Sequence, residues 1–161
     1  MNILVFSDTH RRKDLIEEIL LRKRAVTDLV IHLGDNYRDI ADIRDKFPDI
    51  AFLGVRGNCD LLQSPDYPEE SCITLEGHTI FFTHGHMFDV KRSVSLLVHK
   101  AKKKNADIAL FGHTHKKHRS EVDGVLVINP GSLSEPRDLS GGSFLSLSIT
   151  NGKINANIVE I

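Results

Sequence analysis

Short apolar runs that end abruptly in polar residues recur along the first half of the chain. The first run, Ile3 to Phe6, is followed by the polar residues 7–10. Because this run does not alternate with polar residues, it predicts a strand that is buried on both faces. Similar runs predict strands at 28–33 and 50–55, and apolar stripes between the runs predict helices at 14–24 and 40–47. This alternation of strands and helices predicts an α/β fold with a parallel sheet.

The second half of the chain predicts short strands that are joined by tight turns. Asp123-Gly124 and Asn151-Gly152 are hairpin signals, and Gly77-His78 is expected to form another turn. Asp89 is expected to cap a helix, because the apolar residues that follow it lie on one helical face. Those residues are Val90, Val94, Leu97, Val98 and Ala101, and the expected strands lie within 71–83, 107–111, 125–128, 143–149 and 154–159.

The composition is that of an ordinary globular protein. The chain has 161 residues, 40% of them hydrophobic and 27% charged, so we expect a single domain that spans residues 1–161. The formal net charge of −1 provides no general attraction to nucleic acid or to an anionic membrane. The sequence shows neither a signal-peptide pattern nor a long apolar run. We therefore expect a cytoplasmic protein without a membrane span, in which Cys59 and Cys72 stay reduced.

Side chains that can bind metal ions follow five of the predicted strands. They are Asp8, His10, Asp35, Asn58, His84, His113 and His115. If the extended geometry persists past Phe6, Asp8 and His10 project in the same direction. Each residue alone is compatible with a cap or a turn, but loops at one edge of a sheet converge in space. The seven ligands suit two metal ions that share a carboxylate, and Asp35 is the natural bridge.

Five short motifs resemble the signature blocks of the calcineurin-like metallophosphoesterases. They are Asp8-x-His10, Gly34-Asp35, Gly57-Asn58, Gly85 with its flanking histidines, and Gly112-His113-x-His115. Residues 129–132, Asn-Pro-Gly-Ser, resemble a further block of the small YfcE-type phosphodiesterases. The resemblance covers nearly the whole chain. It implies an α/β fold that is a four-layer α-β-β-α sandwich of two mixed β-sheets flanked by helices.

The resemblance also implies which residues hold each metal ion. One ion would be held by Asp8, His10, Asp35 and His115, and the other by Asp35, Asn58, His84 and His113. We expect two divalent transition metal ions, manganese first, with Ni, Zn, Fe or Co as alternatives, because the ligands mix imidazole nitrogen with oxygen. Such a pair of ions activates a hydroxide, so no nucleophilic side chain is needed. Ser7, Thr9 and Ser132 are therefore expected to be hydrogen-bonding hydroxyls of the loops.

The sequence departs from the family pattern beside Asn58. The family usually has a histidine after this asparagine, credited with stabilising the transition state or protonating the leaving oxygen, and here Cys59 takes its place. A thiol with an ordinary pKa near 8.5 is a poor charge-assisted donor, so we expect weaker help to the leaving group. Asp60 fills the acidic position that follows, and we expect it to orient Asn58. Asp39 falls one place later than the second acid of many relatives, and we assign it no site role.

A few residues near the expected ligands are candidates for contact with a substrate. Arg56 and Arg11 could bind the remaining phosphate oxygens, and His86 could touch the substrate or donate a proton. We expect His32, His78, His99 and His118 to be structural or surface residues. The segment 61–67 is expected to form a short, irregular cap.

The leading functional hypothesis is a metal-dependent phosphodiesterase that acts on a small phosphodiester. Weak help to the leaving group favours diesters with good leaving groups over ordinary monoesters. Two alternatives stay open: a protein-binding scaffold, like the retromer subunit of this fold, and a phosphomonoesterase or nucleotide phosphatase. Relatives assemble as dimers or tetramers, so a homo-oligomer is also open, whereas strong nucleic-acid binding is not expected.

Overall fold

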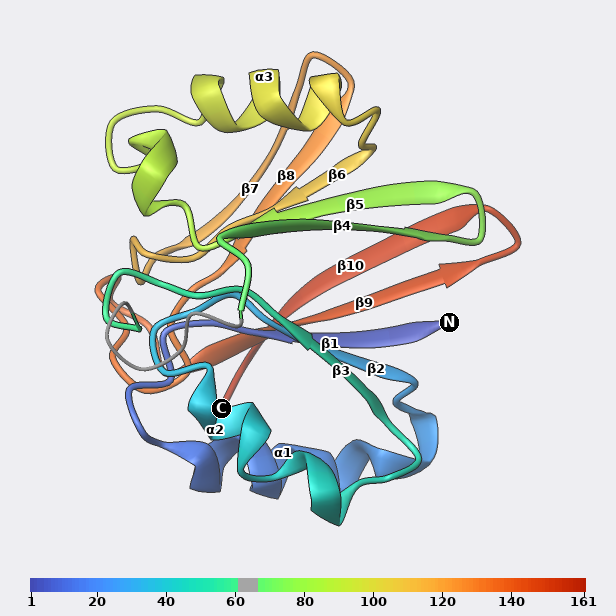
Figure 1. The fold of residues 1–161 in the computed structure, drawn as a ribbon, viewed down its shortest axis with the longest axis vertical. Coiled ribbons are helices and arrows are strands. Elements are labelled where there is room, and N and C mark those ends of the chain that lie inside the picture. The colour runs from blue at the N-terminus through green and yellow to red at the C-terminus, as the bar shows by residue number, and fades with distance from the viewer. Residues whose placement is uncertain (61–66) are drawn as a thin grey trace.

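The computed structural model describes residues 1–60 and 67–161 (Figure 1). The strands in this part of the chain are β1 (Asn2–Phe6), β2 (Leu29–His32), β3 (Ala51–Gly54), β4 (Glu70–Leu75), β5 (His78–Thr83), β6 (Ile108–Leu110), β7 (Lys117–Val122), β8 (Val125–Pro130), β9 (Ser143–Thr150) and β10 (Lys153–Glu160). The helices are α1 (Lys13–Lys23), α2 (Arg38–Ala41) and α3 (Ser95–Lys103), with short 3₁₀ helices η1 (Arg24–Val26), η2 (Arg44–Lys46) and η3 (His86–Phe88). Residues 61–66 of the expected cap lie outside the described residues.

The strands form two mixed five-stranded sheets. The first has the order β10-β9-β1-β2-β3, and the second has the order β4-β5-β6-β8-β7. In the first sheet β1, β2 and β3 are parallel to one another, while β9 and β10 add an antiparallel hairpin. In the second sheet β5, β6 and β8 are parallel, and the edge strands β4 and β7 are antiparallel to their neighbours. Parallel strands thus lie in the centre of both sheets.

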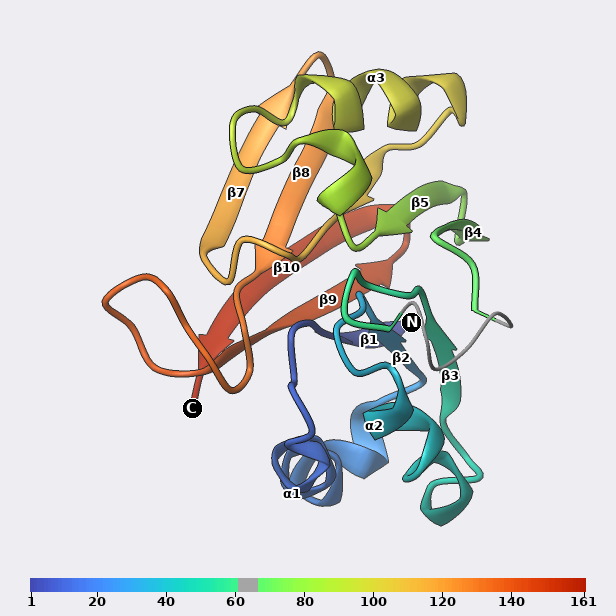
Figure 2. The ribbon, with the colours of Figure 1, turned by 60° about the vertical axis from the view of Figure 1, so that its left-hand side comes forward.

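The two sheets pack face to face, and helices cover their outer faces, as Figures 1 and 2 show together. Ile3 and Val5 of β1 belong to the core between the sheets, whereas Leu4 and Phe6 pack with residues of α1 and α2. This double burial explains why the first apolar run does not alternate. Helix α3 contributes Leu97 to the corresponding cluster on the second sheet. The α-β-β-α sandwich that the resemblance implies is therefore confirmed.

Helix α3 begins at Ser95 rather than directly after Asp89, so the prediction that Asp89 caps it is wrong. Asp89 has a φ of 50° and ends η3, whereas a helix N-cap residue has an extended backbone. The backbone amides of Arg92 and Ser93 donate to the Asp89 carbonyl, which makes a separate turn before the helix. Val90 is buried as predicted, but it packs from this loop.

The hairpins at Asp123-Gly124 and Asn151-Gly152 are confirmed. The hairpin between β4 and β5 turns at Glu76-Gly77, one residue before the predicted Gly77-His78. Glu76 and Gly77 have φ values of 48° and 85°, and a two-residue turn of this kind needs positive φ at both positions. The hydrophobic pattern missed β7, because this edge strand is mostly polar and partly exposed. None of the described helices is long and apolar enough to cross a membrane.

Candidate metal centre

The predicted ligands lie in loops at the carboxyl ends of parallel strands from both sheets. Asp8 and His10 follow β1, and the chain there is not extended as the prediction for this pair assumed, since their φ values are 52° and 43°. Asp35, His113 and His115 also have positive φ. Such backbone conformations are unfavourable for residues with a Cβ atom, and they concentrate at functional sites. The loops therefore hold these side chains in position at a cost in conformational energy.

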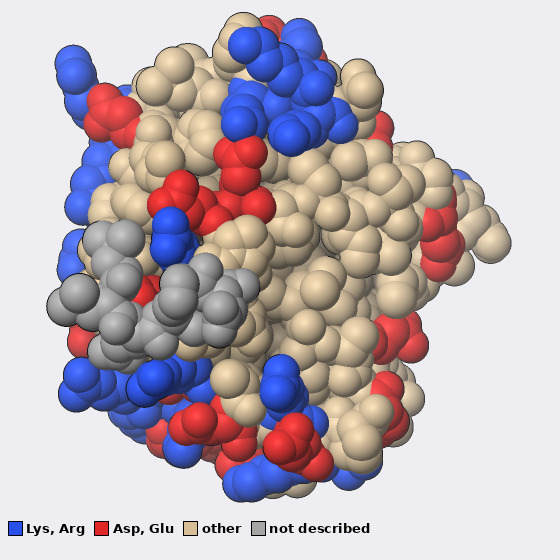
Figure 3. Space-filling model, viewed as in Figure 1, with Lys and Arg blue, Asp and Glu red and all other residues tan. Residues whose placement is uncertain are grey.

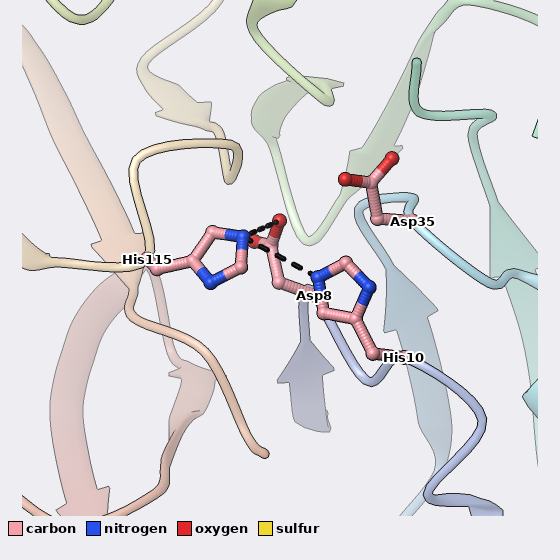
Figure 4. Close-up of side chains that lie close together, drawn as sticks. All are labelled: Asp8, His10, Asp35 and His115. Atoms are coloured by element: carbon pink, nitrogen blue, oxygen red, sulfur yellow. Dashed lines mark hydrogen bonds and ion pairs between the residues drawn. The ribbon is translucent and has the colours of Figure 1, made fainter. Parts of the chain in front are cut away.

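Four of the predicted ligands form one compact group, which Figure 4 shows in close-up. Asp8, His10, Asp35 and His115 each offer an atom within 4.8 Å of those of the others. The Nε2 atom of His115 lies 3.2 Å from Asp8 Oδ1 and 3.4 Å from His10 Nε2. These are the residues that the resemblance assigns to the first ion.

The remaining predicted ligands gather on the other side of Asp35. The Nε2 atom of His84 lies 3.5 Å from Asp35 Oδ2 and 3.2 Å from Asn58 Oδ1. The rings of His84 and His113 are 5.1 Å apart. Asp35 thus lies between the two groups, where a shared carboxylate is expected.

The hydrogen bonds of the histidines show that the site fits cations. His115 Nδ1 lies 2.7 Å from the carbonyl of Glu135, and His84 Nδ1 lies 2.8 Å from the carbonyl of Leu33. A carbonyl can only accept, so Nδ1 of each ring carries a proton and Nε2 faces the carboxylates, where a metal ion would take the place of a second proton. Asp8 Oδ1 is also buried there without a hydrogen-bond donor. Carboxylate oxygens and imidazole nitrogens thus converge on one buried site, which is what a metal site requires.

The electrostatics of the cluster favour positive charge. Burial alone would raise the pKa of Asp35, but the contact with His84 and the Cys59 amide hold it below its ordinary value. Burial likewise opposes ionisation of Asp8, and the contacts with His115 and His84 lower its pKa nonetheless. The pKa values of His84 and His115 are raised against the effect of burial, because carboxylates face both rings. Divalent ions would supply the positive charge that these shifts favour.

The loop that carries Asp35 packs against the loop that carries Asn58 with no room for side chains. A Cβ atom on Gly57 would lie 2.2 Å from Asp35 Oδ1, and one on Gly34 would lie 2.5 Å from Gly57 N. The buried Asp60 joins the two loops, because its carboxylate accepts hydrogen bonds from the amides of Asp35, Asn36 and Gly57 at 2.8–2.9 Å. The expected contact with Asn58 is not among these bonds. Asp60 therefore positions the backbone at Asp35.

Cys59 lies beside the shared carboxylate. Its backbone amide donates to Asp35 Oδ1 at 2.9 Å, and its Sγ atom lies 3.5 Å from Asn58 Nδ2. Burial and the nearby Asp35 raise the pKa of the thiol to about 11. The thiol therefore stays protonated at neutral pH, as a weak donor.

The candidates for substrate contact differ in their surroundings. Arg56 donates from Nη2 to Glu69 Oε1 at 2.5 Å, and its Nε atom is buried without a partner. Arg11 is exposed. His86 lies close to the ligands, with its ring 5.4 Å from that of His84 and 6.2 Å from that of His113. Burial and the charge of His84 lower the pKa of His86, so this residue is neutral near pH 7.

A buried hydrogen-bond chain supports the first group of ligands, and most of its members were not predicted from the sequence. The amide of Gly34 donates to His32 Nδ1 at 3.1 Å, and His32 Nε2 lies 3.0 Å from Thr9 Oγ1. Thr9 Oγ1 in turn donates to Asp39 Oδ2 at 2.6 Å. This chain links the loop of Asp8 to the loop of Asp35. In the sequence, only the position of Thr9 between Asp8 and His10 indicated such a supporting contact.

As the pH is lowered from about 6.5 to about 4, we expect the free energy of unfolding of the metal-free protein to fall, because buried His32 resists protonation. Burial lowers the pKa of His32 to about 4, and the Gly34 amide leaves no room for a proton on Nδ1. In the unfolded chain the His32 imidazole binds a proton near pH 6.5. The contribution of His32 to the stability of the folded protein is therefore complete above that pH and is lost as the pH falls toward 4. It amounts to about 3 kcal/mol at most. Urea unfolding at several pH values would measure it, and an equally steep pH dependence in His32→Gln would contradict this assignment.

Comparisons with known proteins identify the family of this chain. The family model of the calcineurin-like phosphoesterase superfamily domain matches residues 1–152. Probable metallophosphoesterase YsnB of Bacillus subtilis is 32% identical over 152 residues, which cover 94% of this chain and 86% of that protein. Phosphodiesterase YfcE of Escherichia coli is 29% identical over 112 residues, 65% of this chain and 57% of YfcE. The chain therefore belongs to the calcineurin-like phosphoesterase superfamily.

Solved structures share the fold. The crystal structure of a predicted phosphoesterase from Streptococcus pneumoniae has a TM-score of 0.82 and 27% identity, covering 99% of this chain and 88% of that one. Vps29 of Entamoeba histolytica, crystallised with Zn²⁺, has a TM-score of 0.75 and 23% identity, covering 99% and 98% of the two chains. The second likeness shows the fold alone.

Proposed function

We propose that this protein is a metal-dependent phosphodiesterase whose two ions share Asp35. The observation that carries the proposal is that Asp35 is close to both groups of ligands: it lies 3.5 Å from His84 Nε2 and offers an oxygen within 4.8 Å of the ligand atoms of Asp8, His10 and His115. Asp8, His10, Asp35 and His115 would hold one ion, and Asp35, Asn58, His84 and His113 the other. When bound, such a pair of ions activates water and neutralises the charge of the phosphoryl group. Manganese is the ion we would test first.

The surrounding residues orient the ligands and the substrate. The carbonyls of Leu33 and Glu135 fix the rings of His84 and His115, and Asp60 fixes the backbone of Asp35. His86, near the second group, is the candidate for contact with the substrate. Because the Cys59 thiol is a weak donor, the leaving group receives little help from this position. This combination favours diesters with acidic leaving alcohols.

A protein-binding scaffold is the second candidate, because the fold is shared with Vps29. Against it, all seven predicted ligands are present and gathered at the ends of the strands. A site without a catalytic role would be free to lose them.

Hydrolysis of two nitrophenyl esters tests the proposal directly. Metal-stripped protein should hydrolyse neither bis(p-nitrophenyl) phosphate nor p-nitrophenyl phosphate, and added Mn²⁺ should restore turnover of the diester more strongly than that of the monoester. Calorimetry should show two Mn²⁺ ions per chain. If Mn²⁺ binds and neither ester is hydrolysed, the scaffold becomes the better hypothesis and protein partners should be sought.

Cys59→His should raise turnover of the monoester by about tenfold or more, since a positioned imidazole is a far better proton donor than this thiol. The backbone amide of residue 59 bonds to Asp35, so the new side chain starts beside the shared carboxylate. Cys72→His is the matched control, because Cys72 is the other exposed cysteine and lies on the edge strand β4. Unchanged monoester turnover in Cys59→His would refute the leaving-group argument.

A further inference from the structure

A groove lined by cations lies beside the candidate metal centre. It has a volume of about 690 Å³, and its cationic residues are Lys91, Arg92, Lys116, Lys117 and Arg137. Among the described residues no carboxylate lines it, and its apolar lining includes Phe111 and Val94. In Figure 3, Lys and Arg side chains follow the left-hand edge of the molecule, where Figure 1 places the loop before α3 and the loop before β7.

The groove is continuous with the loop of the metal ligands. Thr114 lines it and stands between His113 and His115 in the chain. Arg137 also lines the groove, and its backbone amide donates to the carbonyl of His115 at 2.9 Å. Val90 also lines the groove, and its Cγ2 atom would lie 3.0 Å from a Cβ atom on Gly85, which follows His84 in the chain. The groove therefore borders the loops that carry the predicted ligands, within reach of a second group on a molecule bound there.

Three of the five cations have no carboxylate partner among the described residues. Arg92 pairs with Asp89 and Lys117 pairs with Glu160, but Lys91, Lys116 and Arg137 form no such pair. These three residues come from separate segments of the chain. They concentrate positive charge on one surface of a protein whose formal net charge is −1. Unpaired cations that line one concave surface create a local positive potential and attract an anion there.

We propose that this groove is an anion subsite, which binds a second phosphate group carried by the substrate beside the scissile phosphodiester. The inference rests on the proposed function and narrows its substrate class. The metal ions would neutralise the charge of the scissile phosphodiester. The cationic side chains of the groove would therefore remain available to bind a further anion. Lysine and arginine side chains are the usual partners of phosphate oxygens. The preferred substrates are then phosphodiesters that also carry a terminal phosphate.

Two esters with the same leaving group isolate the contribution of the second phosphate. They are thymidine 5′-(p-nitrophenyl phosphate) and the same ester with a 3′-phosphate. In Mn²⁺-loaded protein at low salt, the 3′-phosphate should raise kcat/KM by about tenfold. The double variant Lys91→Gln/Lys116→Gln should bring the ratio of the two kcat/KM values close to one. The control Lys102→Gln/Lys103→Gln, with the same change of charge on α3, should keep the tenfold ratio.

The outcomes separate the subsite from the proposed activity. Suppose that the unmodified protein hydrolyses both esters with a ratio of kcat/KM values near one, or that the double variant leaves this ratio unchanged. Either result would overturn the subsite and leave the proposed phosphodiesterase activity intact. If neither ester is hydrolysed, the proposed function fails, and calorimetry on the Mn²⁺-loaded protein decides about the groove. Thymidine 3′,5′-bisphosphate should then bind about tenfold more tightly than thymidine 5′-phosphate, in a manner that depends on Lys91 and Lys116. Equal affinities would overturn the subsite.

Discussion

Asp35→Asn should lower metal-dependent hydrolysis of bis(p-nitrophenyl) phosphate by more than about 100-fold, because even residues that only orient metal ligands cost 10–100-fold when they are changed. Asp35 is 3% exposed and lies between the two groups of ligands. An amide keeps the shape of the side chain but replaces one carboxylate oxygen with a group that cannot bind a cation. Calorimetry should therefore show at least one fewer Mn²⁺ ion per chain.

Asp39→Asn is the matched control for this substitution. Asp39 is also buried, at 5% exposed, and lies four residues along the same loop and helix. Burial raises the pKa of Asp39, so a neutral group is tolerated more readily there than at Asp35. The control should bind two Mn²⁺ ions and lose less than about tenfold of its turnover, because Asp39 accepts from Thr9 and not from a ligand side chain. Two bound ions and full turnover in Asp35→Asn would show that this carboxylate is not shared.

Gly57→Ala should lower the free energy of unfolding by about 3 kcal/mol and reduce hydrolysis of the diester by more than about 100-fold. The new methyl group would meet Asp35 Oδ1 at 2.2 Å and Asp35 N at 2.4 Å, which are distances that no relaxation of a side-chain end can relieve. The loop must move, and it carries Asn58, the Gly57 amide that donates to Asp60, and the Cys59 amide that donates to Asp35. Urea unfolding would measure the first effect and Mn²⁺-dependent turnover the second.

Gly124→Ala is the control for Gly57→Ala. It separates the effect of steric crowding from the effect of replacing a glycine. Gly124 lies in the hairpin turn before β8 with a φ of 79°, and no atom would come within 4 Å of an added Cβ. Only the left-handed backbone conformation opposes the change, at a cost of about 1–2 kcal/mol. Turnover per folded molecule should not change. If Gly57→Ala were no more harmful than Gly124→Ala, the close packing of the two ligand loops would not matter for the site.

The positions of the ligands along the chain were predictable because each follows an apolar run. Short apolar runs predicted β1, β2, β3 and β6 to within about two residues, a usual margin for strand ends, although the edge strand β3 is only partly buried. The turn chemistry of Asp123-Gly124 and Asn151-Gly152 predicted two hairpins. The polar strand β7 was missed, because the sequence pattern carries no burial signal for an exposed edge.

The sequence alone determined which residues could be ligands, since residue type and spacing after strands are local properties. Tertiary structure decided the backbone of those loops, where Asp8 and His10 adopt left-handed conformations that no local preference predicts. It also decided the supporting contacts, such as the Glu135 carbonyl at His115 and the Asp60 carboxylate at Asp35. A backbone carbonyl can come from any residue type, so it leaves no trace in a sequence. The cationic groove was likewise hidden, because Lys91, Lys116 and Arg137 are neighbours only in the folded chain.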